Sequence, residues 1–174
     1  QPFIKEHVKR NPNGLWIEPF VGTGVVAFNM RPKHALLIDK NQYIIALYKA
    51  IQNKEITATI VREFLEYHGP KLLEKGKDYY LEIREQFNNN GEPLFFLFLN
   101  RSDFNGMIRF NRKGKFNVPF CQKPNRFAKA YITKICNQVE RVAEVIADND
   151  WRFENGSWKE AFKAAGEDDY IYLD

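Results

Sequence analysis

The sequence contains few residues that form disulfides or bind transition metals. Among its 174 residues it has two cysteines and three histidines. Cys121 and Cys136 have neither the CxxC nor the Cys/His spacing of a zinc site, and they indicate no disulfide framework. His7, His34 and His68 lie far apart along the chain and form no ligand cluster. We therefore expect a protein without a metal, in the reducing environment of the cytoplasm.

Long apolar segments are also missing. No run approaches the length of a membrane span and no signal-peptide pattern is visible, so we expect no membrane partner. Hydrophobic residues still make up 44% of the chain and aromatic residues 15%, which is enough material for a buried core. The length suits one compact domain or a domain with a smaller insertion.

The positive charge is concentrated in one segment. The net charge is only +4, but seven basic residues and one acidic residue fall between Arg101 and Arg126. That segment carries +6 and the rest of the chain carries −2. Clustered lysines and arginines are typical of nucleic-acid binding because they neutralise phosphates. A solvated basic hairpin without such a partner remains the alternative.

Both ends of the chain show the pattern of a parallel α/β sheet. The predicted strands are residues 15–19, 35–39, 151–154 and 170–174, and the predicted helices among them are residues 24–30, 41–52 and 157–165. Ser157 is expected to be the N-cap of the last of these helices, and the final strand is expected to be buried. Alternating strands and helices indicate a doubly wound, Rossmann-like fold.

The middle of the chain reads differently. Its predicted elements are helices at residues 56–67, 78–87 and 94–99, a loop and hairpin at 104–120 that turns at 112–114, and a long amphipathic helix at 127–146. We therefore predict two domains. Residues 1–53 and 127–174 form the α/β domain, and residues 54–126 form a mainly helical insertion with a hairpin.

A glycine-containing turn follows the first predicted strand. The residues Glu18-Pro19-Phe20-Val21-Gly22-Thr23-Gly24 lead into a helix, where glycines let a ligand approach the backbone and the helix offers free amides. Asp39, at the end of the second strand, is placed to bind a pair of ribose hydroxyls. Residues 22–27 also fit the GxGxx(G/A) pattern of dinucleotide-binding turns, so the turn alone leaves both kinds of ligand open.

Two features favour the methyl donor S-adenosylmethionine over NAD. A dinucleotide turn runs directly from an apolar strand into glycine, whereas Glu18-Pro19-Phe20 intervenes here. The Glu18 carboxylate also suits a ligand with a sulfonium cation and an α-ammonium group. The predicted donor site comprises Glu18, Pro19, Phe20, Gly22, Gly24 and Asp39. An NAD-dependent oxidoreductase remains the alternative, although it leaves the basic segment unexplained.

Three motifs resemble the Dam-type DNA adenine methylases. Residues 100–120, NRSDFNGMIRFNRKGKFNVPF, match at more than ten positions that family's segment NR-x-x-(F/Y)-NG-x-x-R-x-N-x-x-G-x-(F/Y)-NVP-(F/Y). Residues 18–24, EPFVGTG, resemble the family's methyl-donor loop. Residues 170–174, YIYLD, resemble the strand that leads into its catalytic Asp-Pro-Pro-Tyr. The order and spacing of the three motifs also agree with the family.

The resemblance implies a site-specific enzyme that methylates the exocyclic amine of adenine with S-adenosylmethionine. It implies that Asp174 is catalytic, and that Ser157 and Trp158 contact the donor, although Trp158 could equally be a core residue. The expected partner is double-stranded DNA with one adenine flipped out. The enzyme is expected to be a monomer, with any restriction endonuclease associated only genetically. The predicted DNA-contacting residues are Arg101, Asn105, Met107, Arg109, Lys113 and Lys115, of which Asn105 and Arg109 match family positions that approach DNA.

The chain departs from the family pattern at both ends. It stops at Asp174, before the expected Pro-Pro-Tyr, and the N-terminal segment PFxKxxGGK is not found. Residues 3–10 are instead predicted to form the helix that follows that segment. We therefore expect a piece of a longer enzyme that is inactive alone. Two further alternatives stay open: a non-catalytic DNA-binding module with an empty donor loop, and methylation of RNA or protein amides, for which related enzymes usually carry Asn in place of Asp174.

Overall fold

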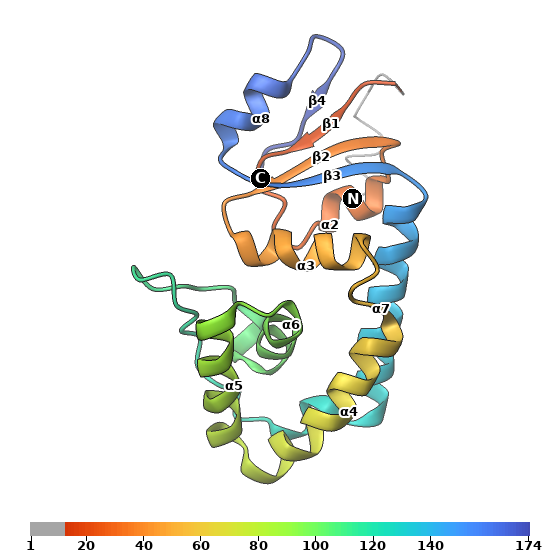
Figure 1. Cartoon of the computed structure of the whole chain (residues 1–174). Helices are drawn as coiled ribbons and strands as arrows, with labels where there is room; N and C mark the ends of the chain where they lie inside the picture. Colours follow the sequence, from red (N-terminus) through yellow and green to blue (C-terminus); the bar gives the residue numbers. More distant parts are fainter. Residues whose placement is uncertain (1–12) are drawn as a thin grey trace. The chain divides into compact units, whose positions relative to one another are not determined.

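The computed structural model describes residues 13–174 (Figure 1). These residues form two compact units. The first contains the described residues up to Asn53 together with Arg141–Asp174, and the second is Lys54–Glu140. Helix α7 (Lys129–Ala147) belongs to the second unit up to Glu140. The helix predicted at residues 3–10 lies outside the described residues.

The first unit is built on a four-stranded sheet in the order β3-β2-β1-β4. Each neighbouring pair of strands is parallel. The strands are β1 (Trp16–Glu18), β2 (His34–Asp39), β3 (Asp150–Asn155) and β4 (Tyr170–Ile171), and the helices are α2 (Val25–Met30), α3 (Gln42–Gln52) and α8 (Trp158–Ala164). This architecture confirms the predicted α/β class with a parallel sheet.

Helices cover both faces of the sheet. Ile17 and Ile38 point to one face and pack with Ala161 of α8. The alternate positions of the strands point to the other face, where Phe153 of β3 stacks on Tyr48 of α3 with ring centroids 4.9 Å apart. Figure 1 shows α3 and α8 on opposite sides of the sheet. Parallel sheets are normally covered on both faces, as this one is.

The last strand is shorter and less buried than predicted. The sequence predicts a buried strand at residues 170–174, whereas β4 contains only Tyr170 and Ile171, both half-buried. The amide of Tyr172 still donates to the carbonyl of Ile17 at 2.9 Å. Pairing stops there because the neighbouring strand β1 itself ends at Glu18 and turns away.

The second unit is mainly helical and carries a hairpin. Its elements are α4 (Ala58–Lys75), α5 (Lys77–Asn90), α6 (Pro93–Ser102), the short 3₁₀ segments η1 (Phe104–Gly106) and η2 (Pro124–Phe127), and the first part of α7. An antiparallel bridge joins Phe110 to Phe116. The amide of Gly114 donates to the carbonyl of Asn111 at 2.9 Å, which closes the turn predicted at residues 112–114.

Helix α4 is longer than the sequence predicts. The pattern predicts a helix at residues 56–67, but α4 continues to Lys75 with Pro70 inside it. Proline removes one helical hydrogen bond and disfavours a helix interior. Leu65 and Leu72 are fully buried on either side of Pro70, and we attribute the continuation to this burial.

Both cysteines of the second unit are free thiols, Cys121 half-buried and Cys136 buried. Within residues 13–174, no group of three or more histidine, cysteine, aspartate or glutamate side chains could hold a metal ion. No helix in the same range is long and apolar enough to cross a membrane.

Gly69 allows α4 to approach η2 closely. A Cβ added at Gly69 would lie 2.9 Å from the Cβ of Phe127 and 3.4 Å from its carbonyl oxygen. Glycine-to-alanine changes inside a helix usually stabilise by about 0.5–1 kcal/mol. We expect Gly69→Ala to have the opposite sign, with a loss of about 1–3 kcal/mol from overpacking.

Urea unfolding of the intact protein measures this effect. The control is Glu74→Ala, at an exposed position of the same helix, which should change the free energy of unfolding by less than about 0.5 kcal/mol. A Gly69→Ala protein more stable than wild type would show that α4 and η2 do not pack this closely.

Candidate functional site

The candidate site of the first unit is built at the carboxyl ends of the four strands. Glu18 is the last residue of β1 and Asp39 the last residue of β2. Ser157 follows the end of β3, and Asp174 follows β4. Because the strands are parallel, these ends share one edge of the sheet, which is where ligands bind in open α/β sheets.

The glycine turn after β1 is docked on the end of β2. The amide of Val21 donates to the carbonyl of Ile38 at 2.8 Å. The amide of Gly22 donates to Oδ2 of Asp39 at 2.9 Å. Gly22 and Gly24 have positive φ angles of 48° and 64°, and residues that carry a Cβ rarely adopt such backbone angles. The prediction that the turn and Asp39 lie together is therefore confirmed in their geometry.

The carboxylate of Asp39 is oriented by backbone amides. Oδ2 accepts from Gly22, and Oδ1 accepts from the amide of Asn41 at 2.8 Å. A carboxylate has about four acceptor positions, so each oxygen retains one for an additional donor. Asp39 is half-exposed. This arrangement can accept hydrogen bonds from a pair of ligand hydroxyls.

Glu18 is a buried carboxylate in the same region. Its side chain is 3% exposed, and Oε1 accepts a hydrogen bond of 2.8 Å from the indole nitrogen of Trp16. Burial raises the pKa of Glu18 to about 7, while the Trp16 bond and the backbone amide of Ala27 lower it. A cation beside Glu18 would favour the ionised carboxylate and would itself be stabilised.

Tyr48 of α3 belongs to this neighbourhood, although the sequence places it in the apolar stripe of a helix. Its hydroxyl lies 3.0 Å from the position that a Cβ on Gly24 would occupy. Burial raises the pKa of Tyr48, and the nearby Glu18 and Asp39 raise it further. The sequence feature that could have indicated this position for Tyr48 is a phenol among aliphatic residues, in the helix that follows Asp39.

The segment after β3 is tied to Asp39. The amide of Gly156 donates to the carbonyl of Asp39 at 3.1 Å. Ser157 is the N-cap of α8, as predicted, and forms a capping box with Glu160. Trp158 is 48% exposed, so the alternative of a core tryptophan is excluded. Ser157 and Trp158 thus follow directly from the same strand edge as Asp39.

Asp174 is exposed, and its charge affects the pKa of Tyr172, which follows β4. Burial raises the pKa of Tyr172, and the charges of Asp174 and Glu18 raise it further. The charges of both carboxylates thus affect the pKa of Tyr172, although Glu18 ends β1 and Asp174 follows β4. The catalytic role of Asp174 stays a prediction.

Six predicted DNA-contacting residues lie in the second unit, and five of them are exposed. The exposed residues are Asn105, Met107, Arg109, Lys113 and Lys115. The sixth, Arg101, is half-buried, and burial together with the charge of Arg126 lowers its pKa. Exposure is what contact with a large ligand requires, but it does not itself assign these residues to DNA.

Arg109 holds the hairpin together. Its Nε donates to Oδ1 of Asn117 and its Nη2 to the Asn117 carbonyl, both at 2.9 Å. In return the amide of Asn117 donates to the carbonyl of Arg109 at 3.2 Å. A guanidinium group has five N–H donors, so three of them are not used by Asn117.

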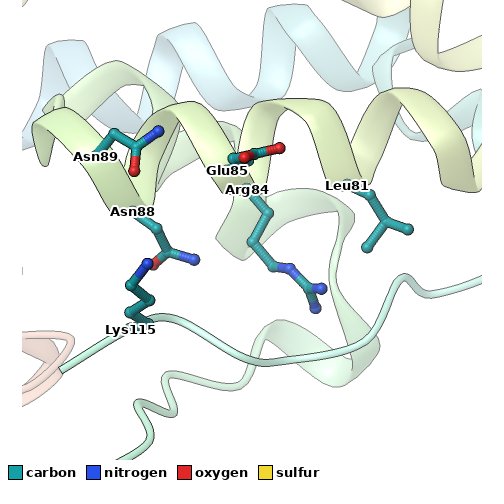
Figure 2. Close-up of a pocket in the computed structure, with 6 residues that line it drawn as sticks. All are labelled: Leu81, Arg84, Glu85, Asn88, Asn89 and Lys115. Carbon is teal, nitrogen blue, oxygen red and sulfur yellow. The ribbon is translucent and has the colours of Figure 1, made fainter. Parts of the chain in front are cut away.

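A small pocket lies between α5 and the hairpin (Figure 2). Its volume is about 280 Å³, and its lining residues are Leu81, Arg84, Glu85, Asn88, Asn89 and Lys115. Figure 2 shows Arg84 and Asn88 extending from α5 toward the segment that carries Lys115. Asn88 exchanges two hydrogen bonds with the backbone of Phe116, at 2.7 and 3.1 Å, and so fixes this strand of the hairpin.

Asp103 is a buried acid inside the basic segment. Its residue surface is 0% exposed, and neither carboxylate oxygen has a hydrogen-bond partner of good geometry among the described residues. Burial raises the pKa of Asp103 to about 7, although the amides of Gly106 and Met107 and the charge of Arg126 lower it. Sequence reasoning counted Asp103 only as a charge and missed its burial.

The fold and the strand-end carboxylates define an α/β protein of the Rossmann-like class. A family model described as "D12 class N6 adenine-specific DNA methyltransferase" matches residues 1–174. The chain belongs to this family.

Individual relatives agree with this assignment. The chain is 34% identical to a DNA adenine methylase of Vibrio cholerae over 164 residues, which cover 91% of the chain and 54% of that protein. It is 34% identical to the DNA adenine methylase of Escherichia coli strain K12 over 132 residues, which cover 74% of the chain and 44% of that protein. It is 28% identical to the type II methyltransferase M1.LlaDCHI of Lactococcus lactis over 169 residues, 91% of the chain and 55% of that protein. The chain spans about half the length of these relatives.

The buried carboxylate of Asp103 makes stability depend on pH. Its pKa is 3.8 in a model peptide and rises to about 7 in the folded chain, so the folded state holds this proton more tightly than the unfolded state. The free energy of unfolding should therefore fall as the pH rises from about 4 to about 7. Asp103→Asn should remove this loss and stabilise the protein at pH 8 by roughly 2–4 kcal/mol.

Denaturant unfolding at pH 4.5 and pH 8 measures the difference. The control is Asp148→Asn, which removes a carboxylate at an exposed position of the first unit and should change the free energy of unfolding by less than about 0.5 kcal/mol. If Asp103→Asn shows the same pH dependence as wild type, Asp103 is not buried as an unpaired acid.

Proposed function

We propose that this protein is a site-specific DNA methyltransferase that transfers the methyl group of S-adenosylmethionine to the exocyclic amine of adenine. The observation that carries the proposal is the hydrogen bond from Gly22 to Asp39, beside the buried carboxylate of Glu18. It joins the glycine turn and two acids in one strand-end site, in a chain that belongs to an adenine-specific methyltransferase family.

The donor set of the site fits S-adenosylmethionine. Asp39 offers one acceptor position on each oxygen for the two ribose hydroxyls. Glu18 offers a carboxylate for the sulfonium or the α-ammonium group. A Cβ at Gly22 would have only the Phe20 carbonyl within 4.0 Å, so space remains open beside that backbone. Phe20 and Trp158, which are about half-exposed, offer flat faces for the adenine ring.

Asp174 is proposed to act on the amine of the target adenine. S-adenosylmethionine supplies an electrophilic methyl carbon on a sulfonium, so transfer leaves a thioether and releases one proton from the amine. The amine is a poor nucleophile because its lone pair is delocalised into the ring. Asp174 would accept a hydrogen bond from the amine and concentrate electron density on nitrogen as it attacks. The adenine must first leave the duplex, since pairing blocks its amine.

We further propose that residues 54–126 are the target-recognition part of the enzyme. The basic segment between Arg101 and Arg126 supports this role through its charge of +6. Arg109 supports it through a rigid hairpin position with unused donors. The exposed residues Asn105, in η1, and Met107, directly after it, would approach the bases, and the half-buried Arg101 would contact a phosphate.

The direct test is methylation of duplex DNA by the full-length protein with labelled S-adenosylmethionine, followed by nucleoside analysis. We expect N6-methyladenine as the labelled product. Asp174→Ala should lower kcat by about 10²-fold or more with little change in donor affinity, because it removes an interaction made in the transition state. Asp39→Ala should mainly weaken donor binding.

Calorimetry distinguishes Asp174→Ala from Asp39→Ala by their affinity for the methyl donor, and it tests whether NAD binds. S-adenosylmethionine should bind the wild type and Asp174→Ala alike, and NAD should bind neither. NAD binding that Asp39→Ala abolishes would support an oxidoreductase instead. Label recovered in RNA or protein alone would overturn the DNA substrate.

We expect Lys113 and Arg109 of the hairpin to make two different kinds of contact with DNA. Lys113 lies in the exposed turn and should bind a phosphate, which carries no sequence information. Arg109 should reach a base edge, where one bidentate contact discriminates by roughly 1–3 kcal/mol. Lys113→Ala should therefore weaken binding to all duplexes alike and reduce the salt dependence by about one phosphate contact. Arg109→Ala should relax the preference at a single base pair.

Binding of the full-length protein to its cognate duplex and to single-pair variants, across a salt series, measures both effects. Asn117→Ala is the control for the hairpin, because it removes one partner of Arg109 without removing the arginine. If Arg109→Ala weakens binding to every duplex equally, Arg109 is a phosphate anchor and base readout lies elsewhere.

A further inference from the structure

We propose that Trp16 is a positioning residue for the methyl-donor site, which holds the Glu18 carboxylate through its indole N–H and supports the strand leading to Asp174 through its ring. The inference rests on the proposed function, because it concerns the cation that Glu18 would meet. Trp16 lies outside the glycine turn, and its sequence context gives no sign of a role in the site.

The indole bond is shielded from water. Trp16 and Glu18 are two residues apart on β1, so strand alternation places both side chains on one face of the sheet. The bond from Nε1 to Oε1 measures 2.8 Å, and the two residues are 1% and 3% exposed. Water cannot easily replace a donor at such a site, so loss of the indole N–H would leave the buried carboxylate short of a partner.

Apart from the Trp16 indole and the backbone amide of Ala27, the groups found around Glu18 are a second acid and two phenols. Asp39 lies at the end of β2, the phenol of Tyr48 comes from α3, and the phenol of Tyr172 follows β4. Neither ion pair found within residues 13–174 involves Glu18. Burial raises its pKa to about 7, and the donors that lower this value are the Trp16 indole and the amide of Ala27. The ionised, correctly aimed carboxylate thus depends on these two donors, and Trp16 supplies the side-chain one.

The ring of Trp16 contacts β4 and the residue after it, in the segment that leads to Asp174. Trp16 of β1 lies opposite Tyr170 of β4 in the parallel pairing of the two strands. The two rings stack with their centroids 4.8 Å apart and an interplanar angle of 20°. The Trp16 ring also stacks near Tyr172 at 6.0 Å and 15°. Asp174 follows two residues later. The Trp16 side chain therefore contacts both the Glu18 carboxylate and the segment that leads to Asp174, the proposed catalytic residue.

The test is donor binding by the full-length protein carrying Trp16→Phe, measured by calorimetry with S-adenosylhomocysteine between pH 6 and 9. Phenylalanine keeps a ring for Tyr170 but has no N–H. We expect the pH midpoint of the affinity to rise by about one unit, which lowers the ionised fraction of Glu18 at pH 7, and with it the affinity, roughly fivefold. Titration of the ligand's own amine is common to all variants and cancels in the comparison.

Trp151→Phe is the matched control. Trp151 is 3% exposed in β3, and its indole nitrogen donates to the carbonyl of Pro32 at 2.7 Å. This variant also loses a buried indole bond, but away from Glu18, so it should lose stability without a shift of the pH midpoint. Glu18→Gln supplies a second measurement, because Trp16→Phe should have no additional effect on affinity when Glu18 can no longer titrate.

The outcomes separate the inference from the proposed function. A wild type that binds neither S-adenosylhomocysteine nor S-adenosylmethionine overturns the proposed function and, with it, the role of Trp16. A wild type that binds, with Trp16→Phe unchanged in affinity and pH midpoint, overturns the inference alone. Equal losses in Trp16→Phe and Trp151→Phe without a pH shift also overturn it, because they indicate a purely structural indole.

Discussion

Asp39 joins the loops that follow three strands of the sheet. Its carboxylate accepts the amide of Gly22 from the turn after β1 and the amide of Asn41 from the turn after β2. Its backbone carbonyl accepts the amide of Gly156 and the side-chain amide of Asn155, at the end of β3. The glycine turn, the start of α3 and the approach to α8 are thus positioned by one residue. A ligand that bonded to Asp39 would meet a site already organised, and little ordering entropy would oppose its binding.

Two buried acids oppose folding at neutral pH. Burial raises the pKa of Glu18 in the first unit and of Asp103 in the second to about 7 in each case. Both acids destabilise the folded chain when ionised, because burial removes most of their hydration. Each also lies in a segment with a proposed ligand, the donor turn for Glu18 and the basic hairpin for Asp103. Local conflict between stability and chemistry is the pattern expected of functional sites.

The parts of the structure that could be predicted from sequence depend on local patterns. The strands around residues 17 and 37, the glycine turn and the N-cap at Ser157 each follow from neighbouring residues, and the capping box with Glu160 has a recognisable spacing. What could not be predicted depends on the tertiary arrangement, which local sequence patterns do not specify. The short β4 results from the length of β1, the exposure of Trp158 from its place on α8, and the Glu18 environment from Trp16 and Tyr48.

In both units the candidate side chains are held by neutral groups. The ion pairs within residues 13–174 are His34 with Asp150 and Arg62 with Glu66, and none of these residues belongs to a proposed site. Asp39 is held by backbone amides, Glu18 by an indole, and Arg109 by an amide oxygen and a carbonyl. A neutral partner fixes the geometry of a charged group and leaves its charge uncancelled. An ion pair fixes the geometry and also cancels the charge. The proposed cationic donor would therefore meet an uncancelled negative charge beside the glycine turn, and the proposed DNA would meet an uncancelled positive charge on the hairpin.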